Sequence, residues 1–146
     1  MDIKDEIIKL LNKGLELEHA ARIQYLAHAE QVKGENAEKI VERLKEIADD
    51  EKSHEDKFRT LIASYLNGEP SMSLAETHKA KGLKEILTVN LKGEKDAIDL
   101  YKQIYQKVVE NKKEFQYQFE TLEHEIRHII CDEEEHVVEL TLLLGI

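Results

Sequence analysis

The sequence has few residues that interrupt helices and few that stabilise a fold covalently. It contains one proline, six glycines, no tryptophan and a single cysteine, Cys131. One cysteine excludes an internal disulfide and a zinc site built from paired cysteines. So few helix breakers favour an all-α protein with long helices. No apolar run approaches the roughly 20 residues that a membrane helix needs, so we expect no membrane partner.

Positive charge is also scarce. Lysine and arginine number 21 against 31 aspartates and glutamates, which gives a net charge of −10. This balance argues against nucleic acid as a partner and favours the attraction of cations. Residues 1–10 already form a charged amphipathic pattern rather than a secretory signal, so we expect a cytoplasmic protein.

The apolar periodicity predicts four helices joined by two tight turns and one long connection. Tight turns make the first two helices one antiparallel hairpin and the last two another, and the long connection gives the crossover topology of a four-helix bundle. We expect a single domain over residues 1–146. Its helices are predicted at about 3–33, 36–66, 83–110 and 114–143, with the crossover at about 68–82.

Two Glu-x-x-His pairs interrupt the apolar stripes of the second and fourth predicted helices, and a lone glutamate interrupts each helix before them. Residues three apart project from one helix face, so a Glu and a His can grip one metal. Burying such groups is costly unless a partner neutralises them. Each lone glutamate is as far from its turn as the paired glutamate, which predicts that all lie at one height. The predicted ligands of a two-metal site are Glu18, Glu51, His54, Glu94, Glu133 and His136, and the sequence does not decide whether Glu51 and Glu133 or Glu18 and Glu94 are the bridging pair.

The Glu-x-x-His spacing by itself is weak evidence, because this glutamate-rich sequence contains it four times. The other two matches are Glu16/His19 and Glu125/His128. At about 100° per residue, Glu16, His19 and His128 are predicted to face solvent, Glu125 is marginal, and His28 is predicted at the surface or edge. Carboxylate and imidazole ligands together suit iron or manganese. A polar layer that fixes helix register is the structural alternative.

Residues near the predicted ligands suggest supporting roles. Asp50 and Asp132 each precede a ligand histidine by four residues, and could accept from its ring N–H within the helix or across to the other hairpin. An ordinary solvated acidic face is the alternative for both. Tyr25 and Tyr101 lie on the buried face near ligands, where core packing is the expected role of both and a redox role is the alternative for Tyr25.

The segments "LELEHAARIQYLAHAE", "DDEKSHEDKF" and "DEEEH", together with Glu94, resemble the ferritin-like diiron superfamily, and specifically its bacterioferritin and rubrerythrin branch. The similarity covers nearly the whole chain. It implies a dinuclear iron centre in which Fe(II) is oxidised by O2 or H2O2. A ferroxidase, with iron storage if the subunits form a shell, is therefore the leading hypothesis. A rubrerythrin-like peroxidase, a manganese catalase-like site and a non-catalytic metal-binding bundle are the alternatives.

The departures from the family refine these expectations. Lys52 stands where bacterioferritins carry the methionine that ligates haem, so no haem is expected. Ala97 stands where rubrerythrins carry a further glutamate, which disfavours the peroxidase. No fifth helix is predicted, as in the 12-subunit shells of Dps-like proteins. Outward apolar positions such as Ile8, Leu26 and Val138 predict a homo-oligomer, at least a dimer, with a 12-subunit shell as the larger alternative.

Overall fold

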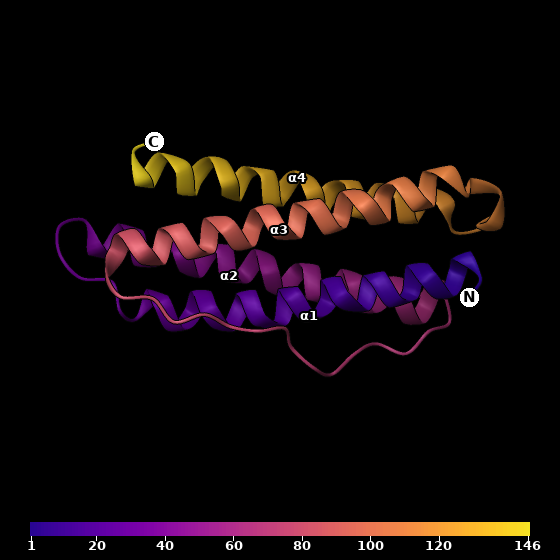
Figure 1. The fold of residues 1–146 in the computed structure, drawn as a ribbon, viewed down its shortest axis with the longest axis horizontal. Coiled ribbons are helices and arrows are strands. Elements are labelled where there is room, and N and C mark those ends of the chain that lie inside the picture. Colours follow the sequence, from indigo (N-terminus) through magenta and orange to yellow (C-terminus); the bar gives the residue numbers. More distant parts are fainter.

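The computed structural model describes all of residues 1–146 and contains four long α-helices and no strand (Figure 1). The helices are α1 (Ile3–Ala29), α2 (Ala37–Thr60), α3 (Gly82–Glu110) and α4 (Phe119–Leu144). A π-helix, η1 (Leu61–Tyr65), extends α2, and a 3₁₀ turn, η2 (Lys112–Glu114), precedes α4. The predicted all-α bundle of two hairpins is confirmed. None of the helices is both long and apolar enough to span a membrane.

The helix ends follow local chemistry. Asp2 caps α1 by accepting a 2.8 Å hydrogen bond from the backbone N–H of Asp5. Gly34 has a φ of 105° in the turn between α1 and α2, a conformation that side chains disfavour. The first helix ends at Ala29, before this turn and earlier than predicted. The last helix begins later than predicted, because the chain after η2 turns to bury Phe115.

The crossover, residues 66–81, runs from the end of α2 to the start of α3 along the outside of α1 (Figure 1). It has no regular secondary structure and is held by hydrogen bonds to α1. Asn12 Nδ2 donates to the carbonyl of Glu69 at 3.0 Å, and Asn12 Oδ1 accepts from Ser71 N at 2.8 Å. Further along, Ala75 N donates to the Glu16 carbonyl at 3.0 Å. The crossover therefore covers a face of α1 that would otherwise meet water.

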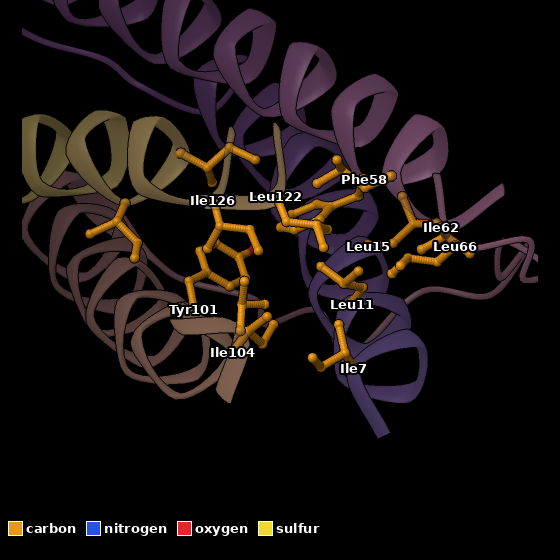
Figure 2. Close-up of a cluster of buried hydrophobic side chains, with 14 of the residues drawn as sticks. Ile7, Leu11, Leu15, Phe58, Ile62, Leu66, Tyr101, Ile104, Leu122 and Ile126 are labelled. Carbon is orange, nitrogen blue, oxygen red and sulfur yellow. The ribbon is translucent and has the colours of Figure 1, made fainter. Parts of the chain in front are cut away.

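Buried apolar side chains form two clusters at opposite ends of the bundle. Figure 2 shows the larger one, where Leu11 and Leu15 of α1 meet Phe58 and, from α3 and α4, Tyr101 and Ile126. The second cluster lies nearer the α1–α2 turn. On α2, α3 and α4 the two clusters are separated by a short stretch whose buried residues are polar, and on α1 the buried residues of this stretch are Glu18, Ala20 and Gln24. The middle of the bundle is therefore a polar layer between two apolar ones.

Candidate metal centre

The polar layer contains all six residues that the sequence predicted as metal ligands. Each of the four helices contributes, because each interrupts its apolar stripe at the same height of the bundle. No one of the six side chains is more than 2% exposed. The six are Glu18 of α1, Glu51 and His54 of α2, Glu94 of α3, and Glu133 and His136 of α4.

The six side chains form two overlapping groups, each compact enough to hold one cation. One group comprises Glu18, Glu51, His54 and Glu133, and the other Glu51, Glu94, Glu133 and His136. Within each group one ligand atom per residue lies within 4.8 Å of all the others. Glu51 and Glu133 belong to both groups, whereas Glu18 and Glu94 belong to one each. The sequence left open which pair is shared; in the geometry the helix 2 and helix 4 glutamates are central.

Each histidine turns one ring nitrogen toward the carboxylates. His54 Nδ1 lies 3.1 Å from Glu133 Oε1 and 3.5 Å from Glu18 Oε1. His136 Nδ1 lies 3.4 Å from Glu94 Oε2 and 3.5 Å from Glu133 Oε1. The ring centroids are 6.5 Å apart. Each group of carboxylates therefore has one imidazole nitrogen directed into it.

The other ring nitrogen of each histidine is hydrogen-bonded to the opposite hairpin. His54 Nε2 lies 2.8 Å from Asp132 Oδ2 on α4, and His136 Nε2 lies 2.9 Å from Asp50 Oδ2 on α2. A carboxylate in this position accepts the N–H and so leaves Nδ1 as the nitrogen that can bind a metal. Of the two arrangements that the sequence allowed for these aspartates, the structure has the one across hairpins.

Two tyrosines donate hydrogen bonds to the outer glutamates, Glu18 and Glu94, which each belong to only one of the two groups. The Tyr25 hydroxyl on α1 donates to Glu94 Oε1 on α3 at 2.7 Å, and the Tyr101 hydroxyl on α3 donates to Glu18 Oε1 on α1 at 2.7 Å. Both rings are essentially buried. Each hydroxyl fixes one carboxylate oxygen and leaves the other free to face the centre. The sequence indicated core packing for Tyr101 and gave no sign of this bond, because only the packed helices bring the two residues together.

Burial and mutual repulsion determine the protonation of the centre. Burial raises the pKa of Glu51 well above its ordinary value, and the charge of Glu133 raises it further. Burial also raises the pKa of Glu133, with Glu18 adding to the effect. Burial opposes protonation of His136, but the neighbouring Glu94 carboxylate outweighs it and raises the pKa of His136 to about 9. Burial likewise favours protonation of Glu94, but hydrogen bonds, first that from His136, bring its pKa below the ordinary value. Without a metal, the centre therefore holds protons in place of cations.

The atoms that lack a partner show what the centre is suited to bind. Apart from Glu125 Oε2, which lies 3.1 Å from Lys57 Nζ, five buried atoms have no hydrogen-bond partner, although buried polar atoms rarely stay unpaired. They are Glu18 Oε2, Glu51 Oε1, His54 Nδ1 and both carboxylate oxygens of Glu133. All belong to the two groups described above. Oxygen and imidazole donors without any thiolate suit iron or manganese, so the residues fit a two-metal carboxylate centre.

A cavity of about 390 Å³ connects this centre to the surface between α1 and α3. Its inner wall includes Glu18 and Glu94. Its sides are lined by small residues, among them Ala21 and Ala97. Its outer rim includes the exposed residues Glu76, His78, Gly93 and Asp96, the first two from the crossover. The cavity therefore extends from exposed residues to the buried carboxylates.

The structure places several other polar residues differently from the sequence prediction. His19 was predicted to face solvent, but its side chain is only 12% exposed and its Nδ1 lies 2.7 Å from the carbonyl of Ser73. His28 was predicted at the surface or edge and is 3% exposed. The crossover covers both, which the helical wheel of α1 could not indicate. His128 is exposed as predicted, and neither it nor His19 joins the metal centre.

One buried carboxylate away from the centre was not predicted. Glu55 is 2% exposed and lies between α1 and α2, where it forms ion pairs with Arg22 and, at 3.1 Å, with Arg59. The i, i+4 spacing of Glu55 and Arg59 was a signal that could have suggested the second pair. Because two guanidinium groups satisfy Glu55, it has a structural role and leaves no free oxygen for a metal.

Comparison with known proteins gives a consistent family assignment. The ferritin-like domain model of the ferritin family matches residues 8–145. A search of curated protein sequences returned no match. Among solved structures, a ferritin-like diiron-carboxylate protein from Bacillus anthracis str. Ames has 24% identity and a TM-score of 0.89, and the match covers 99% of each chain.

Two further solved structures are similar over the whole length of this chain. Rhodobacter capsulatus bacterioferritin, described with a metal-free dinuclear site and a haem iron, has 26% identity and a TM-score of 0.86. The match covers 99% of this chain and 86% of that one. The bacterioferritin-related protein of Bacteroides fragilis, a dodecameric thioferritin, has 24% identity and a TM-score of 0.83 over 99% and 87% of the two chains. At such identities the likeness establishes the fold, and the family model establishes the family.

Proposed function

We propose that this chain, which belongs to the ferritin-like domain family, binds two Fe(II) ions as substrate and oxidises them with O2 or H2O2. The observation that carries the proposal is the pair of overlapping ligand groups that share Glu51 and Glu133. Two cations held by shared carboxylates lie close enough to deliver two electrons to one oxidant. No protein nucleophile is required.

The residues of the centre would have different roles in binding the two cations. Glu51 and Glu133, which belong to both groups, would contribute to both cations, and Glu18 with His54 and Glu94 with His136 would complete one ligand set each. The four carboxylates carry four negative charges, which balance the four positive charges of two Fe(II) ions. The carboxylates and the cations thereby offset the cost of burying either kind of charge alone. Tyr25 and Tyr101 hold the outer carboxylates in position. Manganese is an alternative occupant, because the same donor set suits it.

Charge also supports cation uptake. The net charge of −10 attracts Fe(II) toward the protein, and the cavity between α1 and α3, whose rim carries Glu76 and the ion pair of Asp96 with Lys92, leads to the centre. Ala97 lines this cavity and supplies no carboxylate. The peroxidase alternative, which the resemblance links to a further glutamate at this position, is therefore the less supported one.

Oxidation of Fe(II) by the purified protein tests the proposal. Apoprotein is loaded anaerobically with Fe(II), mixed with O2 or with H2O2, and followed by the near-ultraviolet absorbance of Fe(III). The variant Glu133→Ala should lose most of the rate, whereas Glu134→Ala, an exposed neighbour paired loosely with Lys102, should keep it. Oxidation by the native protein no faster than in buffer would refute the proposal.

A further inference from the structure

A closed ring of four hydrogen bonds joins α1, α3 and the crossover beside the cavity. Gln24 Nε2 donates to Asn90 Oδ1 at 2.9 Å, and Asn90 Nδ2 lies 3.0 Å from His28 Nδ1. The ring closes on the crossover, where His28 Nε2 lies 2.9 Å from the His78 carbonyl and His78 N donates to Gln24 Oε1 at 2.7 Å. We call the side chains of Gln24, His28 and Asn90 the clamp.

The clamp is buried and neutral. Its three side chains are between 2% and 9% exposed. Burial lowers the pKa of His28, so the ring is uncharged near neutral pH and Nδ1 can accept from Asn90. Buried polar groups cost free energy unless all of them are paired, so losing one member leaves the others unsatisfied. An apolar trio would join α1 to α3 equally well but could not hold the backbone of His78.

The clamp holds the crossover at the place where the cavity opens. Glu76 and His78 of the crossover form part of the rim, and Gln24 and Asn90 line the cavity wall below them. His28 does not line the cavity and acts only through its bonds to His78 and Asn90. His28 therefore helps to fix the position of the rim from outside the cavity, where no cation in the cavity would touch it.

We propose that the clamp sets the width of this opening and thereby the rate at which a divalent cation reaches the carboxylate centre. The inference rests on the proposed metal centre, and it assigns His28, Gln24 and Asn90 as positioning residues. His28 lies outside the cavity and acts on access alone, so loosening the clamp there should change the rates of uptake and release together and leave the number of bound cations unchanged.

The test uses Co(II), whose binding is followed by its visible absorbance without any oxidation. The variant His28→Leu has a side chain of similar size and cannot bond to His78 or Asn90. Losing such a bond shifts a local opening equilibrium by about three- to tenfold, and we expect Co(II) uptake and release to accelerate by that factor. Hydrogen exchange at the backbone N–H of His78 should accelerate as well, while the Co(II) stoichiometry stays at the native value.

Asn12→Ala is the matched control. Asn12 also holds the crossover by two hydrogen bonds, at Glu69 and Ser71, but it does not line the cavity. Its loss should leave the Co(II) rates at the native value. Gln24→Met removes the clamp's other bond to the crossover and replaces His28→Leu if that variant does not fold.

Two results would overturn the clamp: native rates in both clamp variants, or equal acceleration in Asn12→Ala. A native protein that binds no Co(II) would instead refute the proposed metal centre, so the two failures are distinguishable. If the native protein binds no Co(II), the clamp is still tested by hydrogen exchange: a rate at the His78 N–H of the clamp variants equal to the native rate would refute the clamp as well.

Discussion

His54 and Asp132, which are 78 residues apart in the sequence, meet across the two hairpins with 2.8 Å between Nε2 and Oδ2. The aspartate directs Nδ1 of His54 into the carboxylate centre. Removing such a partner typically weakens metal binding by about ten- to a hundredfold. We therefore expect Asp132→Ala to bind Co(II) or Fe(II) correspondingly more weakly in a competition titration, with Glu134→Ala unchanged. Native affinity in Asp132→Ala would show that the ring is positioned by packing alone.

Because Glu51 and Glu133 belong to both ligand groups, removing one of them should lower the number of bound metals more than removing Glu18 or Glu94. Glu18→Ala leaves the group of Glu51, Glu94, Glu133 and His136 complete, so about one metal per chain should remain of the two. Glu51→Ala damages both groups and should reduce binding to well below one. Metal analysis after anaerobic loading and desalting distinguishes the two. His128→Ala, at an exposed position, should keep the native value. Equal losses in Glu18→Ala and Glu51→Ala would contradict the bridging assignment.

The protonation of the centre predicts how stability depends on pH. The folded pKa values of Glu51, Glu133 and His136 are raised, so these groups stabilise the metal-free protein at low pH. For His136 this contribution is complete below 6.5 and is lost as pH rises through about 9. The lowered pKa of Glu94 acts in the opposite direction. We expect the melting temperature of the apoprotein to fall between pH 6.5 and 9, because His136 loses its proton over this range, whereas the effect of Glu94 is confined to pH values below its ordinary pKa of 4.5.

Added metal should reverse this trend. Metal ligands must be deprotonated, so cation binding displaces the protons of Glu51, Glu133 and His136 and strengthens as pH rises. Saturating Mn(II), which avoids oxidation, should therefore raise the melting temperature more at pH 8 than at pH 6. These two pH values lie on either side of the ordinary pKa of histidine. An increase that is the same at both values would mean that the ligands carry no protons in the apoprotein.

Haem binding is expected to be absent. Lys52 is exposed on α2, and a protonated amine cannot ligate iron. Rhodobacter capsulatus bacterioferritin, which holds haem iron, is the informative positive control. Protein expressed with ample haem and purified should show no Soret band, and Lys52→Met would be the variant to gain one. A stoichiometric Soret band in the native protein would prove this expectation wrong.

The surface predicts self-association. Leu26 is 40% exposed and Val138 57% exposed, as the sequence predicted, whereas Ile8 is half-buried against the larger apolar cluster and Gly68. We expect at least a dimer, and a 12-subunit shell would favour storage over detoxification. Light scattering at micromolar concentration decides between these states. A monodisperse particle near the chain mass of 17.0 kDa would refute the dimer.

The six candidate ligands could be predicted from the sequence because the information is local. Helical spacing places Glu51 and His54 on one face, and equal distances from a turn place Glu18 level with Glu51. Both relationships depend only on the geometry of a helix and its hairpin. The same reasoning predicted the four helices and the crossover, which the structure confirms. Helix ends were less accurate, because a short turn such as η2 depends on where Phe115 can be buried.

Only the tertiary structure decided which groups meet between hairpins and beneath the crossover. The rotation of one hairpin against the other makes Glu51 and Glu133 the shared carboxylates and brings Tyr101 to Glu18. The path of the crossover buries His28, which a helical wheel places at the surface or edge. These contacts join segments far apart in the chain. Their formation depends on how the whole apolar surface packs, and helical periodicity carries no information about that packing.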